Sequence, residues 1–70
     1  MIYIFKTSVL TENDIQSLKP YLDKLPQTFW NFDLEDCDKI LRVESLEEVS
    51  EEVIISVLQQ RGFTCEVLLY

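Results

Sequence analysis

The densest group of potential ligand atoms in the chain lies in one short segment, residues 33–38. Its members are four carboxylates and one thiol: Asp33, Glu35, Asp36, Asp38 and Cys37. Carboxylates suit hard cations, and a thiolate adds affinity for softer ones. The spacing does not match a calcium-binding loop, which needs a glycine at its sharp turn and a distant bidentate glutamate. We interpret the segment as a solvated hairpin tip, and a metal site at Cys37 and the hairpin carboxylates is the alternative.

Groups that support enzymatic catalysis are scarce. The chain contains no histidine, so a Ser–His or Cys–His pair of nucleophile and base is impossible. Its one glycine is Gly62, so no glycine-rich loop is present to bind phosphate. We therefore predict a protein that is not an enzyme and that has no cofactor.

The cysteine content favours a reducing compartment. Cys37 and Cys65 are too few to suggest a disulfide framework. Cys65 has the strand parity of Phe63 and Val67, so we expect its side chain to lie in the core. We expect the hairpin tip and the last strand at different edges of the sheet, which argues against a disulfide between the two cysteines. The N-terminal residues lack the basic start and long apolar run of a signal peptide, so the predicted location is cytoplasmic.

The charge balance restricts the partners. Thirteen acidic and six basic residues give a formal charge of −7, which repels phosphate backbones and anionic lipid headgroups. We therefore expect neither nucleic acid nor a membrane as a partner.

Seventy residues with 47% hydrophobic content are enough for one small folded domain, which we assign to residues 1–70.

The first half of the chain shows a strand, a helix and a second strand. Residues 2–9 alternate between two faces, as a strand does. Thr11 has the form of a helix N-cap, and apolar residues follow at helical spacing up to position 25. Pro20 removes one backbone donor from this helix and favours a bend in its last turns. Residues 29–34 alternate again and predict a second strand.

The second half continues with a strand, a helix and a last strand. Residues 39–44 alternate and should pair with the preceding strand as a hairpin. Ser50 precedes a second helix with an apolar stripe, and Gly62 lies where a left-handed C-cap is needed. Residues 63–69 then predict the final strand.

This order of elements predicts a fold and exposes one surface. Right-handed crossovers place both helices on one face of a four-stranded antiparallel sheet, which is the α+β, ferredoxin-like βαββαβ sandwich. Strand parity sends one group of side chains to the uncovered face: Ile2, Ile4, Ile40, Arg42 and Leu68. An apolar patch with a charged rim is typical of an interaction surface, so we predict a protein partner or self-association there.

Over nearly its whole length the chain resembles the heavy-metal-associated domain family. In that family a Met-x-Cys-x-x-Cys loop after the first strand binds soft metal ions. The alignment puts Thr11 and Asp14 at the two cysteine positions, so the family's copper-binding thiolates are missing. The chain is also similar to small family members without this motif, in residues 5–7, 18–20 and 30–38. The resemblance implies the family fold without copper binding through this loop. Together with the uncovered sheet face, it leads us to predict a non-enzymatic interaction module.

Overall fold

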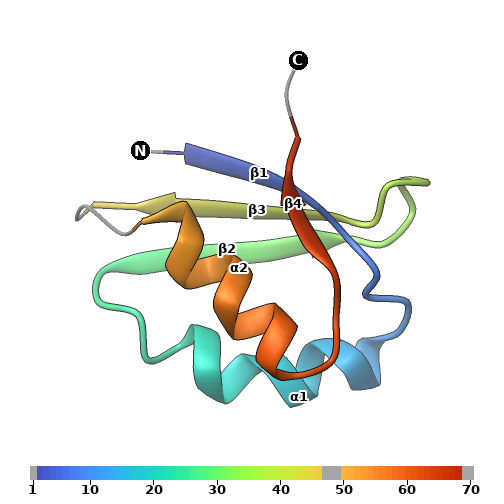
Figure 1. Ribbon diagram of the computed structural model, residues 1–70, viewed down its shortest axis with the longest axis horizontal. Coiled ribbons are helices and arrows are strands. Elements are labelled where there is room, and N and C mark those ends of the chain that lie inside the picture. Colours follow the sequence, from blue (N-terminus) through green and yellow to red (C-terminus); the bar gives the residue numbers. More distant parts are fainter. Residues whose placement is uncertain (1, 47–49, 69–70) are drawn as a thin grey trace.

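The computed structural model describes residues 2–46 and 50–68. Six elements follow one another along the chain (Figure 1). They are β1 (Ile2–Thr7), α1 (Glu12–Leu22), β2 (Thr28–Asp33), β3 (Ile40–Ser45), α2 (Glu51–Gln60) and β4 (Cys65–Val67). This is the βαββαβ order that the sequence predicts.

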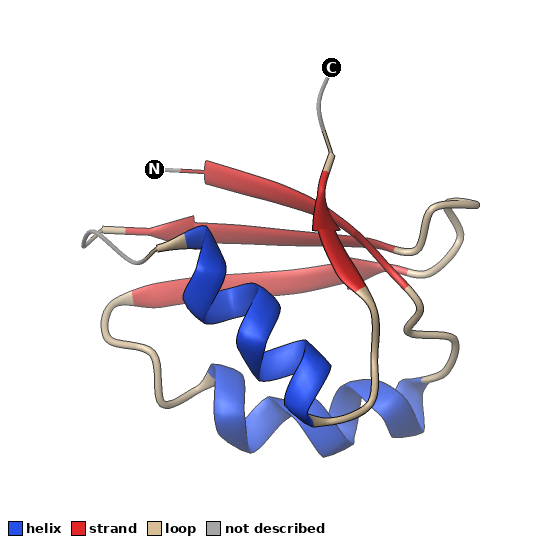
Figure 2. Ribbon diagram, in the orientation of Figure 1, coloured by secondary structure: helices blue, strands red, loops and turns tan. Residues whose placement is uncertain are grey.

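The four strands form one antiparallel sheet in the order β2-β3-β1-β4. Both helices cover the same face of the sheet, and the opposite face has no covering element within the described residues (Figure 2). The shortest extent of the molecule is 17 Å, which suits one sheet and one layer of helices. The predicted ferredoxin-like sandwich is therefore confirmed.

The core lies between the sheet and the two helices. From the sheet, Phe5, Leu41 and Val43 are completely buried. Each helix contributes two completely buried side chains: Leu18 and Leu22 from α1, and Ile54 and Leu58 from α2. These residues recur every second position in the strands and every fourth position in the helices, so one face of each element supplies the core.

Local hydrogen bonds fix both ends of α2. The Ser50 side chain accepts a hydrogen bond from the backbone N–H of Glu52 at 3.1 Å and caps the start. At the other end, Phe63 N–H donates to Leu58 O and Gly62 N–H donates to Gln59 O, both at 3.0 Å. This pair of bonds is a Schellman motif, and it requires the left-handed backbone that Gly62 adopts at φ +90°. The predicted C-cap at Gly62 is confirmed.

Several element bounds differ from the predicted ones. β1 ends at Thr7 rather than at residue 9. Ser8 N–H still donates to Thr64 O at 3.2 Å, in the register of the pairing with β4, whereas Val9 N–H donates to the Thr7 hydroxyl at 3.3 Å. α1 continues past Pro20 and ends at Leu22, so Pro20 lies in its last turn, where few helical hydrogen bonds follow.

The last strand is shorter than predicted, with β4 ending at Val67. Leu68 N–H still donates to Ile4 O at 2.9 Å, so the pairing with β1 continues one residue further. Position 69, the predicted end of this strand, lies outside the described residues. In the part of the chain that the structure describes, neither helix has the length and apolar character to cross a bilayer.

Candidate functional site

The uncovered side of the sheet, which we call the open face, is built by the residues that alternate with the core positions. Strand pairing arranges most of them in three rows across the sheet: Phe29, Glu44 and Ile2; Asn31, Arg42 and Ile4; Asp33, Ile40, Lys6 and Glu66. Leu68 lies opposite Ile4, to which its backbone N–H is bonded. The five residues predicted for the surface, Ile2, Ile4, Ile40, Arg42 and Leu68, thus share this face.

The open face leaves large apolar side chains in contact with solvent. Ile2 and Phe29 are each 63% exposed, whereas Ile4 and Ile40 are half-buried. Leu46 follows β3 with the same parity and is 71% exposed, and its N–H donates to Gln27 O at 3.0 Å. An isolated exposed apolar residue is ordinary, but these lie on adjoining strands of one face.

Phe29 and Glu44 belong to the first row of the open face, but they are not among the residues predicted for this surface. The signal was present, because Phe29 lies two positions before Asn31 and Glu44 lies two positions after Arg42. Both have the parity of the residues that were chosen. The pairing register, Phe29 with Glu44 and Glu44 with Ile2, brings them beside the isoleucine patch.

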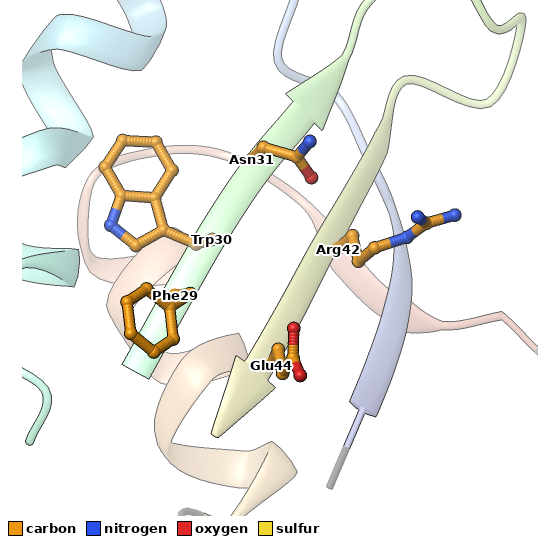
Figure 3. Close-up of a pocket in the computed structure, with 5 residues that line it drawn as sticks. All are labelled: Phe29, Trp30, Asn31, Arg42 and Glu44. Carbon is orange, nitrogen blue, oxygen red and sulfur yellow. The ribbon is translucent and has the colours of Figure 1, made fainter. Parts of the chain in front are cut away.

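Two open hollows lie side by side on this face. The first, of about 330 Å³, is lined by the five residues labelled in Figure 3: Phe29, Trp30, Asn31, Arg42 and Glu44. The second, of about 350 Å³, has its own lining: Ile4, Asn31, Phe32, Asp33, Asp36, Ile40 and Arg42. Asn31 and Arg42 line both hollows and therefore occupy the centre of the open face. A partner side chain in either hollow would contact them.

Arg42 is the cation at the centre of this surface. Its cross-strand neighbours are Asn31 and Ile4, which carry no charge. Within residues 2–46 and 50–68, the ion pairs are Lys6 with Asp38 at 3.9 Å and Lys19 with Asp23 at 3.1 Å, so Arg42 takes part in none. A guanidinium offers a planar set of donors that matches a carboxylate. The Arg42 side chain is therefore available to an acidic group from a partner.

The charges of the open face nearly balance. It carries two cations, Lys6 and Arg42, and three anions, Asp33, Glu44 and Glu66. The chain as a whole has a formal charge of −7. Most of the excess negative charge therefore lies on other surfaces, where two copies of the chain, or any acidic partner, would repel each other.

The hairpin tip brings together three of the five predicted ligand residues. Ligand atoms of Asp36, Cys37 and Asp38 lie within 4.8 Å of one another. One oxygen of Asp36 already accepts the Asp38 N–H at 2.8 Å, and an oxygen of Asp33 accepts the Glu35 N–H at 3.2 Å. These bonds are typical of turns in which aspartate side chains order the loop backbone. Asp33 and Glu35 lie outside the three-residue group.

The hairpin tip bends onto the end of β1, where Thr7 N–H donates to Asp38 O at 3.2 Å and the Thr7 hydroxyl donates to Lys39 O at 2.6 Å. The strand order β2-β3-β1-β4 puts the hairpin and β4 on opposite sides of β1, so the prediction that the tip and the last strand belong to different edges of the sheet is confirmed. The two thiols remain separate, with Cys37 exposed and Cys65 buried.

Thr11 and Asp14, which the sequence resemblance aligns with metal-binding cysteines, bind each other's backbone. The Thr11 hydroxyl accepts the Asp14 N–H at 3.2 Å, and the Asp14 carboxylate accepts the N–H groups of Thr11 at 3.2 Å and Leu10 at 3.1 Å. This reciprocal arrangement is a capping box, and it satisfies donors at the start of α1. The predicted N-cap at Thr11 is confirmed.

Two titratable groups are shifted by their surroundings. Burial raises the pKa of the Cys65 thiol to about 12, and the nearby charge of Glu66 adds to this shift. Hydrogen bonds from Lys19 and then from the Trp30 indole, which donates at 3.0 Å, hold the pKa of Asp23 below its ordinary value. Both groups lie away from the open face. Cys65 is thus a core residue, as predicted, and Asp23 joins α1 to the side chain of Trp30 on β2.

Comparison with known proteins adds no family to this description. The chain matches no family model, and no curated protein matches it.

Proposed function

We propose that this chain is a non-enzymatic interaction module that docks a protein partner, or a second copy of itself, on its open face. One observation carries this proposal: among residues 2–46 and 50–68 no element covers the open face, and its exposed apolar side chains adjoin the Arg42 guanidinium, which forms no ion pair with any of those residues. Covering such a face would remove apolar surface from water and give Arg42 a charged partner. The module is placed in the cytoplasm on the basis of its cysteine usage.

The charge of the molecule supports a protein as the partner. The net charge of −7 disfavours nucleic acid and anionic membranes. The open face itself combines apolar groups with both signs of charge, as protein interfaces do. A partner with apolar side chains and a carboxylate would fit the surroundings of Arg42.

The resemblance to heavy-metal-associated domains supports the fold of this module and not its metal chemistry. Thr11 and Asp14 supply a hydroxyl and a carboxylate where soft metal ions need thiolates. Both side chains also form hydrogen bonds within the capping box. We therefore propose a degenerate family member that does not bind copper through this loop.

The test replaces the two most exposed apolar side chains in the first row, Ile2→Glu with Phe29→Glu. Because each is 63% exposed, these changes should leave the fold intact, which circular dichroism checks. The matched control is Val53→Glu, an exposed apolar residue of α2 on the helical side. We expect the double variant to lose association or partner capture, while the control keeps both. The proposal would be overturned if the wild-type protein remained monomeric and captured the same proteins as the double variant.

A second candidate function is metal binding at the hairpin tip, which the proximity of Asp36, Cys37 and Asp38 favours. Metal analysis of the purified protein, followed by zinc titration, tests it. Stoichiometric metal that is lost in Cys37→Ser would establish this site and its role. A metal-free protein whose melting temperature does not change when zinc or copper is added would exclude it, because a ligand that binds the folded state raises stability.

A further inference from the structure

We propose that the occupant of the open face is a second copy of the chain, which stacks face to face in one particular register. This inference rests on the proposed function of the open face and adds the identity of the partner. The two-fold axis lies between the two sheets, runs across the strands, and passes between the row of Glu44 and the row of Arg42. Such an axis exchanges these two rows between the copies while each strand stays opposite its own counterpart.

The register of β3 makes this arrangement complementary in charge. Glu44 and Arg42 are two positions apart on the same face of the same strand. When the rows exchange, Arg42 meets the partner's Glu44, and Glu44 meets the partner's Arg42. Neither side chain has an ion pair within the described residues, so two new pairs form without breaking existing ones. Each pair joins a guanidinium to a carboxylate, the strongest type of side-chain hydrogen bonding.

The neighbouring strand supplies matching apolar contacts. On β1, Ile2 lies in the row of Glu44 and Ile4 lies in the row of Arg42. The same exchange places Ile2 against the partner's Ile4, and the reciprocal contact brings four isoleucine side chains together. One row further out, Ile40 meets the partner's Leu46, which is 71% exposed in the single chain. Apolar contacts therefore flank the charged pairs, as in the centre of a protein interface.

The net charge of the molecule explains why two copies would meet here. Each copy has a formal charge of −7, so most orientations bring like charges together. The open face has two cations and three anions, so its charge is close to neutral, which reduces the repulsion at contact. A two-fold arrangement also makes each favourable pair occur twice. The open face is in this sense complementary to itself.

The test is a charge exchange in the 70-residue chain, measured by sedimentation equilibrium up to about 1 mM, a range that detects a weak dimer. Arg42→Glu and Glu44→Arg should each weaken dimerisation by roughly tenfold or more, because each places like charges together at two positions. The double variant R42E/E44R should restore the wild-type affinity to within roughly threefold, because the pairs form again with reversed polarity. The control is Lys24→Glu, which changes the net charge as Arg42→Glu does but alters an exposed residue outside the sheet.

The outcomes separate this inference from the proposed function. A salt-sensitive dimer whose affinity returns in the double variant supports the second copy and the register. A dimer that the charge exchange does not restore, or that Lys24→Glu weakens equally, overturns the register. A monomer at about 1 mM overturns the second copy. In that case the proposed function is decided by the double variant Ile2→Glu with Phe29→Glu. If this variant no longer captures another protein that the wild type captures, the proposed function stands. If the variant captures the same proteins, the proposed function fails together with the inference.

Discussion

Two neighbouring residues of β1 show how differently the two faces of one sheet are used. Phe5 points to the helices and is completely buried, whereas Ile4 points to the open face and is half-buried. Their cross-strand partners differ in the same way, since Phe5 pairs with Leu41 and Ile4 pairs with Arg42. Both faces contain large apolar side chains. The difference is the second layer, because α1 and α2 complete one face and leave the other incomplete.

The polar groups of the two faces differ as well. On the helix-covered side, the buried Thr7 hydroxyl donates to Lys39 O and accepts the Val9 N–H. Every buried polar side-chain atom among the described residues has a hydrogen-bond partner. On the open face, Arg42 is exposed and forms no ion pair within the described residues. The covered face therefore satisfies its polar groups internally, whereas the open face leaves this guanidinium without a charged neighbour among those residues.

Truncating one side chain on each face of β1 should give the largest difference in the free energy of unfolding. Phe5→Ala removes an aromatic ring from the centre of the core and should lower the free energy of unfolding by about 3–5 kcal/mol. Ile4→Ala removes a half-buried side chain and should cost under about 1.5 kcal/mol in the monomer. Urea denaturation at low protein concentration, where association does not contribute, measures both. Equal losses in the free energy of unfolding would mean that the open face is as tightly packed as the core, which would contradict the difference between the two faces.

The two cysteines provide a chemical probe of the same contrast. Because the folded state raises the Cys65 pKa from its ordinary value near 9 to about 12, the unfolded chain loses this proton first as pH rises. The stability contribution of the protonated thiol is therefore fully present below pH 9 and is lost as pH rises towards 12. At pH 8 the three-unit shift also lowers the thiolate fraction of Cys65 roughly 1,000-fold.

Alkylation kinetics followed by mass spectrometry should then show rapid labelling at the exposed Cys37 and slow labelling at Cys65. Denaturation curves between pH 9 and 12 should show a fall in stability that is smaller in Cys65→Ala than in Cys37→Ala. The comparison between these two variants cancels the titration of lysines and tyrosines in that range. Rapid labelling of Cys65 in the folded protein would show that β4 opens readily and does not close the core.

Local sequence rules predicted the fold because most elements have strong signals of their own. Alternation identified the strands, Thr11 and Ser50 marked the helix starts, and Gly62 marked a helix end. Each signal reflects a short-range physical requirement, such as an unpaired N–H group or a positive φ angle. Crossover handedness then leaves few ways to assemble these elements.

The candidate site was less predictable because it depends on contacts between distant segments. The bend of the hairpin tip onto β1 results from bonds between Thr7 and residues more than thirty positions away. No local pattern encodes that bend. The pairing of Phe29 with Glu44, and of Glu44 with Ile2, likewise depends on the register, which parity alone does not define.

The smallest predicted effect concerns the start of α1, where a substitution should lower stability and leave association unchanged. Thr11→Ala removes the hydroxyl that accepts the Asp14 N–H, and it should lower the free energy of unfolding by about 1 kcal/mol. Thr11→Ser keeps an accepting oxygen and should remain close to the wild type, which makes it the control. Because the capping box lies at the end of a helix and not on the open face, neither change should alter the dimer dissociation constant. If Thr11→Ala weakened association as much as Arg42→Glu does, the two faces would be coupled through the sheet, and the open face could not be treated as an independent docking surface.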